Sequence, residues 1–293
     1  MRSGPAGGRW RWSVRTGRFR TRLASGEKNG RKRMATLACV YDTEPAPRRP
    51  HDIIAPPGGS RSADRTPRPG PRAMGKWLTG SVAEGAQHVI AAAFDQAEAR
   101  DPGHRRTWVV LVDGARHQLD LIQAEAARRS IAINIIVDLV HVLEYLWGAA
   151  WCLHRKDDPA AESWVAVHAL ALLGGQVART ITTITSQAAD LTGTRRHGID
   201  TCLEYLTAKA AYLHYDQALE AGWPIATGVI EGACRHLVAD RLDIAGSRWG
   251  LPGAEAVLTL RAVQTNGDLE PYLRYHSHQE HKRTYQAEYD LTA

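Results

Sequence analysis

The chain has 293 residues, of which 44% are hydrophobic and 23% are charged, a composition typical of a globular protein rather than of a fibrous or low-complexity one. It contains no run of about 18 apolar residues, which excludes an ordinary membrane-spanning helix. The Arg-rich amino terminus is not followed by the apolar core of a signal peptide. The four cysteines are widely scattered, without the spacing of zinc ligands or of a disulfide framework. We therefore expect a cytoplasmic protein.

The net charge of +6 is unevenly distributed along the chain. Residues 1–73 contain 17 Lys and Arg against 5 Asp and Glu, a balance of +12, whereas the remainder has a balance of −6. A basic segment of this kind can bind nucleic acid or remain a solvated, disordered tail. Residues 1–27 mix Arg, Gly, Ser and Trp without a helical or strand period, so we prefer the tail interpretation for them.

Up to residue 140 the hydrophobic pattern predicts strands that alternate with helices. Short apolar runs predict strands over residues 34–41, 107–112 and 131–137, and helical periodicity predicts helices over 81–100 and 116–129. A segment rich in Pro, Gly and Arg, residues 45–73, is predicted to be a loop. The last strand–helix–strand succession indicates a parallel pair joined by a right-handed crossover.

After Asp138 the pattern becomes almost entirely helical. Helices are predicted from about Val140 to Leu219, with breaks at 157–159 and 192–194, and again over 227–245 and 254–264. An Asn-Gly pair at 266–267 is expected to end the last helix. The sequence therefore predicts an α/β protein whose carboxy-terminal half is mostly helical.

Two of the predicted strands each end in an aspartate, Asp113 and Asp138. Ligands collect at the carboxyl ends of parallel strands, and carboxylate oxygens are what Mg²⁺ prefers in proteins. A turn or a helix cap is the more frequent role for an aspartate at such a position, and Asp-Gly is a common turn pair. Both interpretations stay open for each residue.

Glu231 stands near the start of a predicted helix, with Thr227 as a suitable N-cap. A surface pair with Arg235, one turn further on, is the ordinary interpretation of a lone glutamate there. Gly228, Gly232 and Ala233 are small, however, and would permit close backbone approach beside Glu231. We therefore keep Glu231 as a candidate site residue.

Other candidates carry weaker signals. His141 and Glu144 share a helix face and could help hold a metal, although a capping or core role is the commoner one for such a pair. The arginines Arg241, Arg248 and Arg261 could contact phosphates, although solvation at the surface is the usual role of such side chains. The sequence contains no P-loop, no dinucleotide-binding glycine motif and no serine or cysteine nucleophile signature.

Several segments resemble bacterial insertion-sequence transposases of the ISKra group. The resemblance is carried by residues 108–115, by residues 136–147 and, most distinctively, by residues 222–236, whose sequence is GWPIATGVIEGACRH. Residues 246–250 and 253–258 also fit. The similarity extends from about Gly26 to the end of the chain, and the long motif around Glu231 is specific, whereas the Asp-Gly motif alone is weak.

The resemblance implies an RNase H-like α/β fold, with an incomplete mixed sheet in this chain and a mostly helical insertion before the last acidic residue. Asp113 matches the second of three catalytic carboxylates of these DDE enzymes, and Glu231 matches the third. Asp138 would be a supporting residue or an alternative second acid. The family's chemistry implies two Mg²⁺ or Mn²⁺ ions held by Asp113 and Glu231, insertion-sequence ends and target DNA as partners, and a homo-oligomer at the nucleoid of a bacterium.

Arg235, Arg241 and Arg248 are the arginines that we expect to contact DNA in such an enzyme. The expected domains are a basic arm that does not resemble the family (1–27), a partial RNase H-like core (28–140), a helical insertion (141–222), a helical end of the catalytic domain that carries Glu231 (223–270), and a C-terminal tail (271–293).

The chain departs from the family pattern at its amino terminus. The first catalytic aspartate and a helix-turn-helix region should precede Gly26, and neither is found; we do not expect Asp42, which follows the first strand, to substitute. We therefore expect a truncated reading frame with little or no strand transfer on its own. The alternatives are a non-catalytic DNA-binding or oligomerising remnant that interferes with the full-length enzyme, and an unrelated helical interaction protein.

Overall fold

The computed structural model describes residues 34–57, 66–155, 157–243 and 249–286. The predicted basic arm, residues 1–27, lies outside the described residues. The chain forms two compact units. The described part of the first unit comprises residues 34–42, 74–102, 229–243 and 249–286, and that of the second comprises 43–57, 66–73, 103–155 and 157–228. No helix in the described ranges is long and apolar enough to cross a membrane.

The first unit is built on an antiparallel strand pair, β1 (Thr36–Asp42) and β2 (Met74–Ser81). Strand β1 confirms the predicted strand, whereas β2 was not predicted. The sequence of β2, MGKWLTGS, contains two glycines and no long apolar run, so its local signal is weak. Pairing with β1 and two hydrogen bonds between the backbone of Leu78 and the side chain of Asn266, of 2.7 and 2.9 Å, hold it in place.

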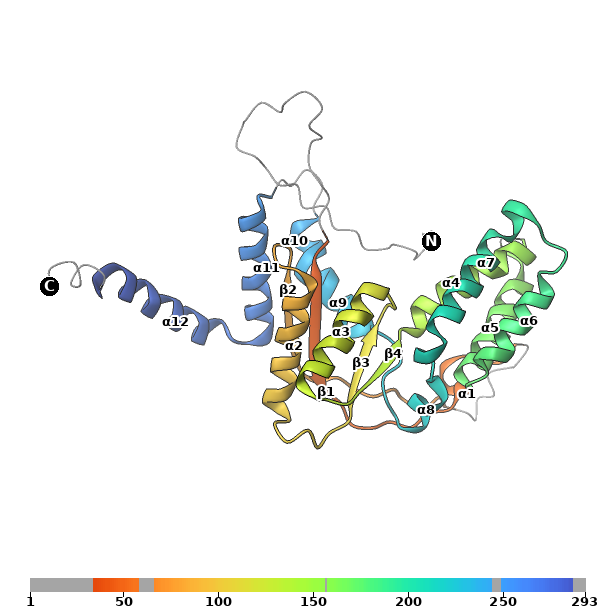
Figure 1. The fold of residues 1–293 in the computed structure, drawn as a ribbon, viewed down its shortest axis with the longest axis horizontal. Helices are drawn as coiled ribbons and strands as arrows, with labels where there is room; N and C mark the ends of the chain where they lie inside the picture. The colour runs from red at the N-terminus through yellow and green to blue at the C-terminus, as the bar shows by residue number, and fades with distance from the viewer. Residues whose placement is uncertain (1–33, 58–65, 156, 244–248, 287–293) are drawn as a thin grey trace, which may run out of the picture. The chain divides into compact units, whose positions relative to one another are not determined.

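Helices enclose this strand pair (Figure 1). They are α2 (Ala86–Arg100), α9 (Gly228–Cys234), α10 (Asp240–Leu242) and α11 (Leu251–Asn266), with a π-helical turn at Arg235–Ala239. Helix α2 begins five residues later than predicted, because Ser81 still belongs to β2. A core cluster that includes Leu78, Leu237 and Leu258 is buried between β2 and these helices.

Helix α11 ends as predicted at Gly267, whose left-handed φ of 84° allows the chain to turn. The predicted C-terminal tail contains most of α12 (Leu269–His281) and a π-helical turn at Lys282–Gln286. No residue of α12 is buried, and Leu273 and Tyr275 are 49% and 65% exposed.

The second unit contains the predicted parallel pair, β3 (Trp108–Val112) and β4 (Ile133–Val137), joined by α3 (Arg116–Arg129). We expected one incomplete mixed sheet. Instead, the described residues form two separate sheets of two strands each, β1–β2 and β3–β4. The mixed α/β class is thus confirmed. The apolar side chains of β3 are only half-buried apart from Val112, whereas Ile136 and Val137 of β4 are buried.

The rest of the second unit is helical, as predicted, and includes a bundle whose helices pack against one another in succession (Figure 1). Its helices are α1 (Pro50–Ile53), α4 (Leu139–Leu153), α5 (Pro159–Leu173), α6 (Val177–Gln187), α7 (His197–Lys209) and α8 (Tyr215–Glu220), with 3₁₀ turns at Gly193–Arg196 and Ala210–Tyr212. The bundle core is formed by fully buried side chains such as Leu146, Leu172 and Leu206.

The compact units divide the chain differently from the expected domains. The expected RNase H-like core, 28–140, contributes β1, β2 and α2 to the first unit and β3, α3 and β4 to the second. Glu231 belongs to the first unit, and Asp113 and Asp138 belong to the second.

Candidate functional site

Asp113 follows β3 directly and is exposed, while Val112 before it is buried. Its Oδ1 accepts a hydrogen bond of 3.0 Å from the backbone N–H of Ala115, as in an Asx turn. Within the described residues its Oδ2 has no partner. Asp113 thus combines the turn role with an available carboxylate oxygen, and the two interpretations of this residue are compatible.

Gly114 is required by the local geometry of the Asp-Gly turn. It has a left-handed φ of 89°, and a Cβ at this position would lie 2.8 Å from the hydroxyl oxygen of Tyr205. That hydroxyl donates a 2.8 Å hydrogen bond to the carbonyl of Asp113. A tyrosine of α7 therefore fixes the backbone that carries the carboxylate.

Asp138 follows β4 and is buried, with 7% of its surface exposed. Its Oδ1 accepts a hydrogen bond of 2.9 Å from the N–H of Val140 and so caps the start of α4. Its Oδ2 accepts a hydrogen bond from the hydroxyl of Thr227. Because both oxygens are engaged by protein groups, Asp138 is a helix cap and a positioning residue in this structure.

A group of polar and aromatic side chains surrounds Tyr205. We call Asp113, Asp138, His141, Glu144, Tyr145 and Tyr205 the strand-end cluster. Tyr145 stacks on Tyr205 with a centroid separation of 3.9 Å, and His141 meets Tyr205 edge-on at 5.7 Å. His141 Nδ1 lies 3.2 Å from a carboxylate oxygen of Glu144, so the predicted shared face of these two residues is confirmed.

The acidic residues of the cluster lie close enough to Tyr205 to raise the pKa of its phenol. Burial, then Tyr145, then the negative charges of Asp113, Asp138 and Glu144 raise the pKa of Tyr205 well above its usual value. The phenol therefore stays protonated at neutral pH and serves as a hydrogen-bond donor. The cluster is a negatively charged region at the carboxyl ends of β3 and β4.

Carboxylates of this kind suit Mg²⁺ or Mn²⁺ by their donor chemistry. In the described part of the chain, however, no three His, Cys, Asp or Glu side chains gather closely enough to hold a metal ion. One carboxylate oxygen of Asp113 accepts a hydrogen bond from the protein, whereas both oxygens of Asp138 do so.

Glu231 is exposed on α9 in the first unit. Ala233 of this helix is buried in the core cluster, and Ile230 and Cys234 pack against it. Burial, and then the charge of Glu231, raises the pKa of the Cys234 thiol to about 11. A Cβ placed on Gly228 or Gly232 would meet no described atom within 4 Å, so the space around these glycines is open.

The expected DNA-contacting arginines lie close to Glu231 in the sequence. Arg235 is exposed at the start of the π-helical turn, and Arg241 is exposed on α10; Arg248 lies outside the described residues. In the described structure no ion pair joins Arg235 to Glu231, so the ordinary pairing interpretation is not observed. Arg261, a weaker candidate, donates from Nε to the carbonyl of His236 at 3.1 Å and thus has a structural role.

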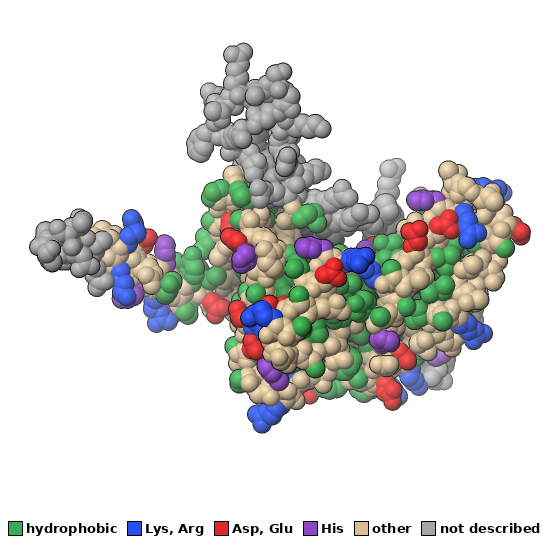
Figure 2. Space-filling view, viewed as in Figure 1, with side chains coloured by type: hydrophobic (Ala, Val, Ile, Leu, Met, Phe, Trp, Pro, Cys, Tyr) green, Lys and Arg blue, Asp and Glu red, His purple; other side chains and the backbone are tan. Residues whose placement is uncertain are grey.

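Positive charge is not concentrated on one visible surface. On the face seen in Figure 2, Lys and Arg side chains form small separate patches among hydrophobic and neutral ones.

Sequence reasoning missed Tyr205 and Tyr215 as parts of the strand ends. Tyr215 is fully buried and donates a 2.7 Å hydrogen bond to the carbonyl of Val137, as Tyr205 does to that of Asp113. Each tyrosine lies more than 70 residues from the carbonyl that it caps, and no local pattern reveals such a pairing.

Comparisons with known proteins return no relatives. No protein-family model, no curated protein and no solved structure matches the chain.

Proposed function

We propose that this chain is part of a DDE-type transposase, an enzyme that cleaves and joins DNA by metal-dependent phosphoryl transfer. The observation that carries the proposal is the hydrogen bond from Thr227 to the carboxylate of Asp138. It connects the long Gly222–His236 motif, on which the resemblance chiefly rests, to the acidic end of the parallel strand pair.

Chain length supports the sharing of a cation by Asp113 and Glu231. Glu231 follows Thr227 by four residues, and a chain of that length spans at most about 14 Å. Thr227 itself donates a hydrogen bond to Asp138 of the strand-end cluster. The short connection between Thr227 and Glu231 is compatible with a cation shared by Asp113 and Glu231.

The residues would have distinct roles in this enzyme. Asp113 and Glu231 would hold Mg²⁺ or Mn²⁺ through their available carboxylate oxygens. When bound, two such ions neutralise charge on the scissile phosphate and activate the attacking hydroxyl. Asp138 would position Thr227 and the start of α4, and Arg235 and Arg241 would bind phosphate oxygens of the insertion-sequence end or of the target DNA.

We propose that this chain alone has little or no strand-transfer activity. The resemblance requires a further catalytic carboxylate, the first of the three, on an earlier strand, and no aspartate precedes Asp42 in the sequence. Asp42 Oδ2 accepts a 3.1 Å hydrogen bond from Arg100 Nη1. This ion pair neutralises its charge, which supports our expectation that Asp42 does not substitute.

The test is a cleavage and strand-transfer assay on insertion-sequence-end DNA with Mg²⁺ or Mn²⁺, using the full chain and its Asp113→Asn and Glu231→Gln variants. We expect activity near background for all three. Robust activity that both substitutions abolish would support the transposase chemistry and refute the loss of activity. Activity that neither substitution affects would refute the assignment of both residues.

A second candidate function is a non-catalytic remnant that binds DNA or assembles with intact copies of the transposase. The exposed side chains of Arg235 and Arg241 support the DNA-binding part of this role. It predicts salt-sensitive DNA binding that is unchanged by EDTA, and slower transposition by an intact enzyme when the two are mixed.

A further inference from the structure

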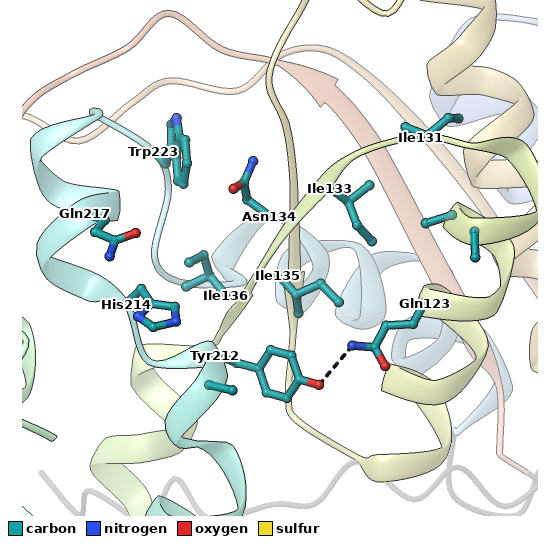
Figure 3. Close-up of a pocket in the computed structure, with 13 residues that line it drawn as sticks. Gln123, Ile131, Ile133, Asn134, Ile135, Ile136, Tyr212, His214, Gln217 and Trp223 are labelled. Atoms are coloured by element: carbon teal, nitrogen blue, oxygen red, sulfur yellow. Dashed lines mark hydrogen bonds between the residues drawn. The ribbon is translucent and has the colours of Figure 1, made fainter. Parts of the chain in front are cut away.

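A pocket of about 440 Å³ lies in the second unit, beside β4 (Figure 3). Four consecutive residues of the strand, 133–136, contribute to its lining. Because successive side chains of a strand point to opposite faces, a pocket lined by consecutive residues runs along the edge of the strand rather than over one face. Strand β4 pairs with β3 on one side and has no strand partner on the other within the described residues.

The direction of the backbone groups along β4 follows from one hydrogen bond. The N–H of Asp138 donates to the carbonyl of Val112 at 2.8 Å and so points toward β3. Since the direction alternates along a strand, the N–H and C=O groups of Ile133, Ile135 and Val137 point away from β3. The carbonyl of Val137 already accepts from Tyr215, which leaves the groups of Ile133 and Ile135 facing the pocket.

The opening is limited to these two residues. Just beyond β4, the N–H of Leu139 donates to the carbonyl of Ile225 at 2.9 Å. Among the described residues, the outward-pointing backbone groups of Ile133 and Ile135 have no such partner. The carbonyl of Ile133 and the N–H of Ile135 stand next to each other on such an edge. They form an acceptor–donor pair on the strand edge that lines the pocket.

The walls are neutral and partly aromatic. Figure 3 shows Trp223, His214 and Gln217 on one side of β4, and Gln123 and Tyr212 joined by a 3.0 Å hydrogen bond on the other. No Lys, Arg, Asp or Glu lines the pocket among the described residues. In the same part of the structure, the side chains of His214 and Gln217 have no hydrogen-bond partner. A neutral, flat ligand with polar edges fits this lining, and a phosphate group does not.

We propose that this pocket binds an unpaired adenine or cytosine base of a DNA strand. Both bases carry an amino group next to a ring nitrogen, which complements the carbonyl of Ile133 and the N–H of Ile135. Thymine offers a carbonyl where the amino group is needed. The aromatic and isoleucine side chains would cover the faces of the base, and the sugar and phosphate would remain outside.

An extended peptide is the other kind of ligand that can bind an exposed strand edge, by adding a strand to the sheet. The short opening disfavours it, because two residues supply too few ladder hydrogen bonds, whereas a planar base is satisfied by one acceptor–donor pair. The assignment of the base to DNA rests on the proposed function; the recognition of an adenine-type edge rests on the pocket alone.

The test measures the binding of labelled single strands of deoxyadenosine, deoxycytidine or thymidine to the full chain by fluorescence anisotropy, with EDTA present. We expect the adenine and cytosine strands to bind about tenfold more tightly than thymidine strands, as stacking and one base-edge pair allow. Hydrogen exchange should show slower exchange of the Ile135 amide with the adenine strand. Because no metal is present, a failure of catalysis does not affect this result.

Ala127→Phe provides the pocket variant, because Ala127 is exposed and lines the pocket. Ala124→Phe is the matched control, on the exposed surface of the same helix and outside the lining. We expect the first substitution to remove the preference for adenine and the second to preserve it, with equal melting temperatures. Equal binding of all strands by the parent chain would overturn the proposal.

Two further outcomes would also overturn it. Free adenosine that binds as tightly as the adenine strand would identify a nucleoside site rather than a DNA-base site. Protection of the Ile135 amide by an alternating Val-Thr heptapeptide, without protection by any DNA strand, would identify a strand-addition edge.

Discussion

The hydroxyl of Tyr205 lies 2.8 Å from the carbonyl oxygen of Asp113, to which it donates a hydrogen bond across 92 positions of the sequence. The contact joins α7 of the helical bundle to the end of β3. A residue of the helical segment thus sets the backbone on which a candidate catalytic carboxylate stands, so the bundle and the strand ends are structurally dependent on each other.

The first prediction concerns Gly114 in this contact. Gly114→Ala should destabilise the protein by about 1–3 kcal/mol, because alanine is disfavoured at a left-handed φ and its Cβ would displace the Tyr205 hydroxyl. Thermal unfolding measures the effect. Gly148→Ala is the control: Gly148 lies inside α4 with no atom within 4 Å of the added Cβ, so this change should stabilise by about 0.5–1 kcal/mol. Equal effects would contradict the Tyr205 contact.

The second prediction concerns the hydroxyl of Thr227. Thr227→Val keeps the shape of the side chain but leaves the buried Oδ2 of Asp138 without its donor, and should cost about 1–3 kcal/mol in the free energy of unfolding. Thr227→Ser retains the hydroxyl and should cost less. Urea unfolding of the three proteins distinguishes them, and a serine variant as unstable as the valine variant would show that the methyl group matters instead.

The third prediction separates the two strand-end aspartates. Asp113→Asn should change the stability by less than about 0.5 kcal/mol, because the residue is exposed and an amide oxygen still accepts from Ala115. Asp138→Asn should destabilise the protein by about 1–3 kcal/mol, because an amide cannot accept at both positions. Denaturant midpoints provide the comparison. If Asp113→Asn destabilised the protein more than Asp138→Asn, the structural role that we assign to Asp138 would be wrong.

The fourth prediction is a pH dependence at Glu125 of α3. The hydrogen bond from Arg128 is the main cause that lowers the pKa of Glu125 to about 2 from 4.5; burial opposes it, and Arg129 adds to it. A depressed pKa means that the stabilisation is complete above pH 4.5 and is lost as the pH falls toward 2. Glu125→Gln should therefore cost about 0.5–1 kcal/mol at pH 7 and nearly nothing at pH 2.

Melting temperatures of the parent and the Glu125→Gln variant between pH 7 and pH 2 test this pH dependence. Glu204→Gln is the control, because Glu204 is exposed on α7 and forms no ion pair within the described residues. Its difference from the parent should stay small at every pH. A Glu125→Gln effect that persists at pH 2 would show that the interaction does not depend on the carboxylate charge.

The local sequence pattern was sufficient to predict several helices and strands. The apolar run of β3, the helical period of α3 and the Asn-Gly stop of α11 appear at or near their predicted positions. Strand β2 escaped prediction because β1 and the side chain of Asn266, 188 positions from Leu78, stabilise it more than its own sequence does.

In the candidate site, too, local features were predicted and features that depend on distant contacts were not. Asp113 and Asp138 were identified because both follow apolar strands, and their positions after β3 and β4 are confirmed. The engagement of Asp138 by Thr227 and the capping of Asp113 by Tyr205 depend on tertiary contacts that carry no periodic signal. The sharing of a cation by Asp113 and Glu231 stays a prediction.

Helix α12 has a consequence for handling the protein. With 13 residues and none of them buried, it has the length at which an isolated helix is only marginally stable in water. Its backbone should open often enough for trypsin to cut at Arg274, long before a protected site such as Arg129 of α3, whose side chain is 9% exposed, becomes accessible. Brief digestion should therefore release the carboxyl end of α12 while α4, which contains no Lys or Arg, stays intact.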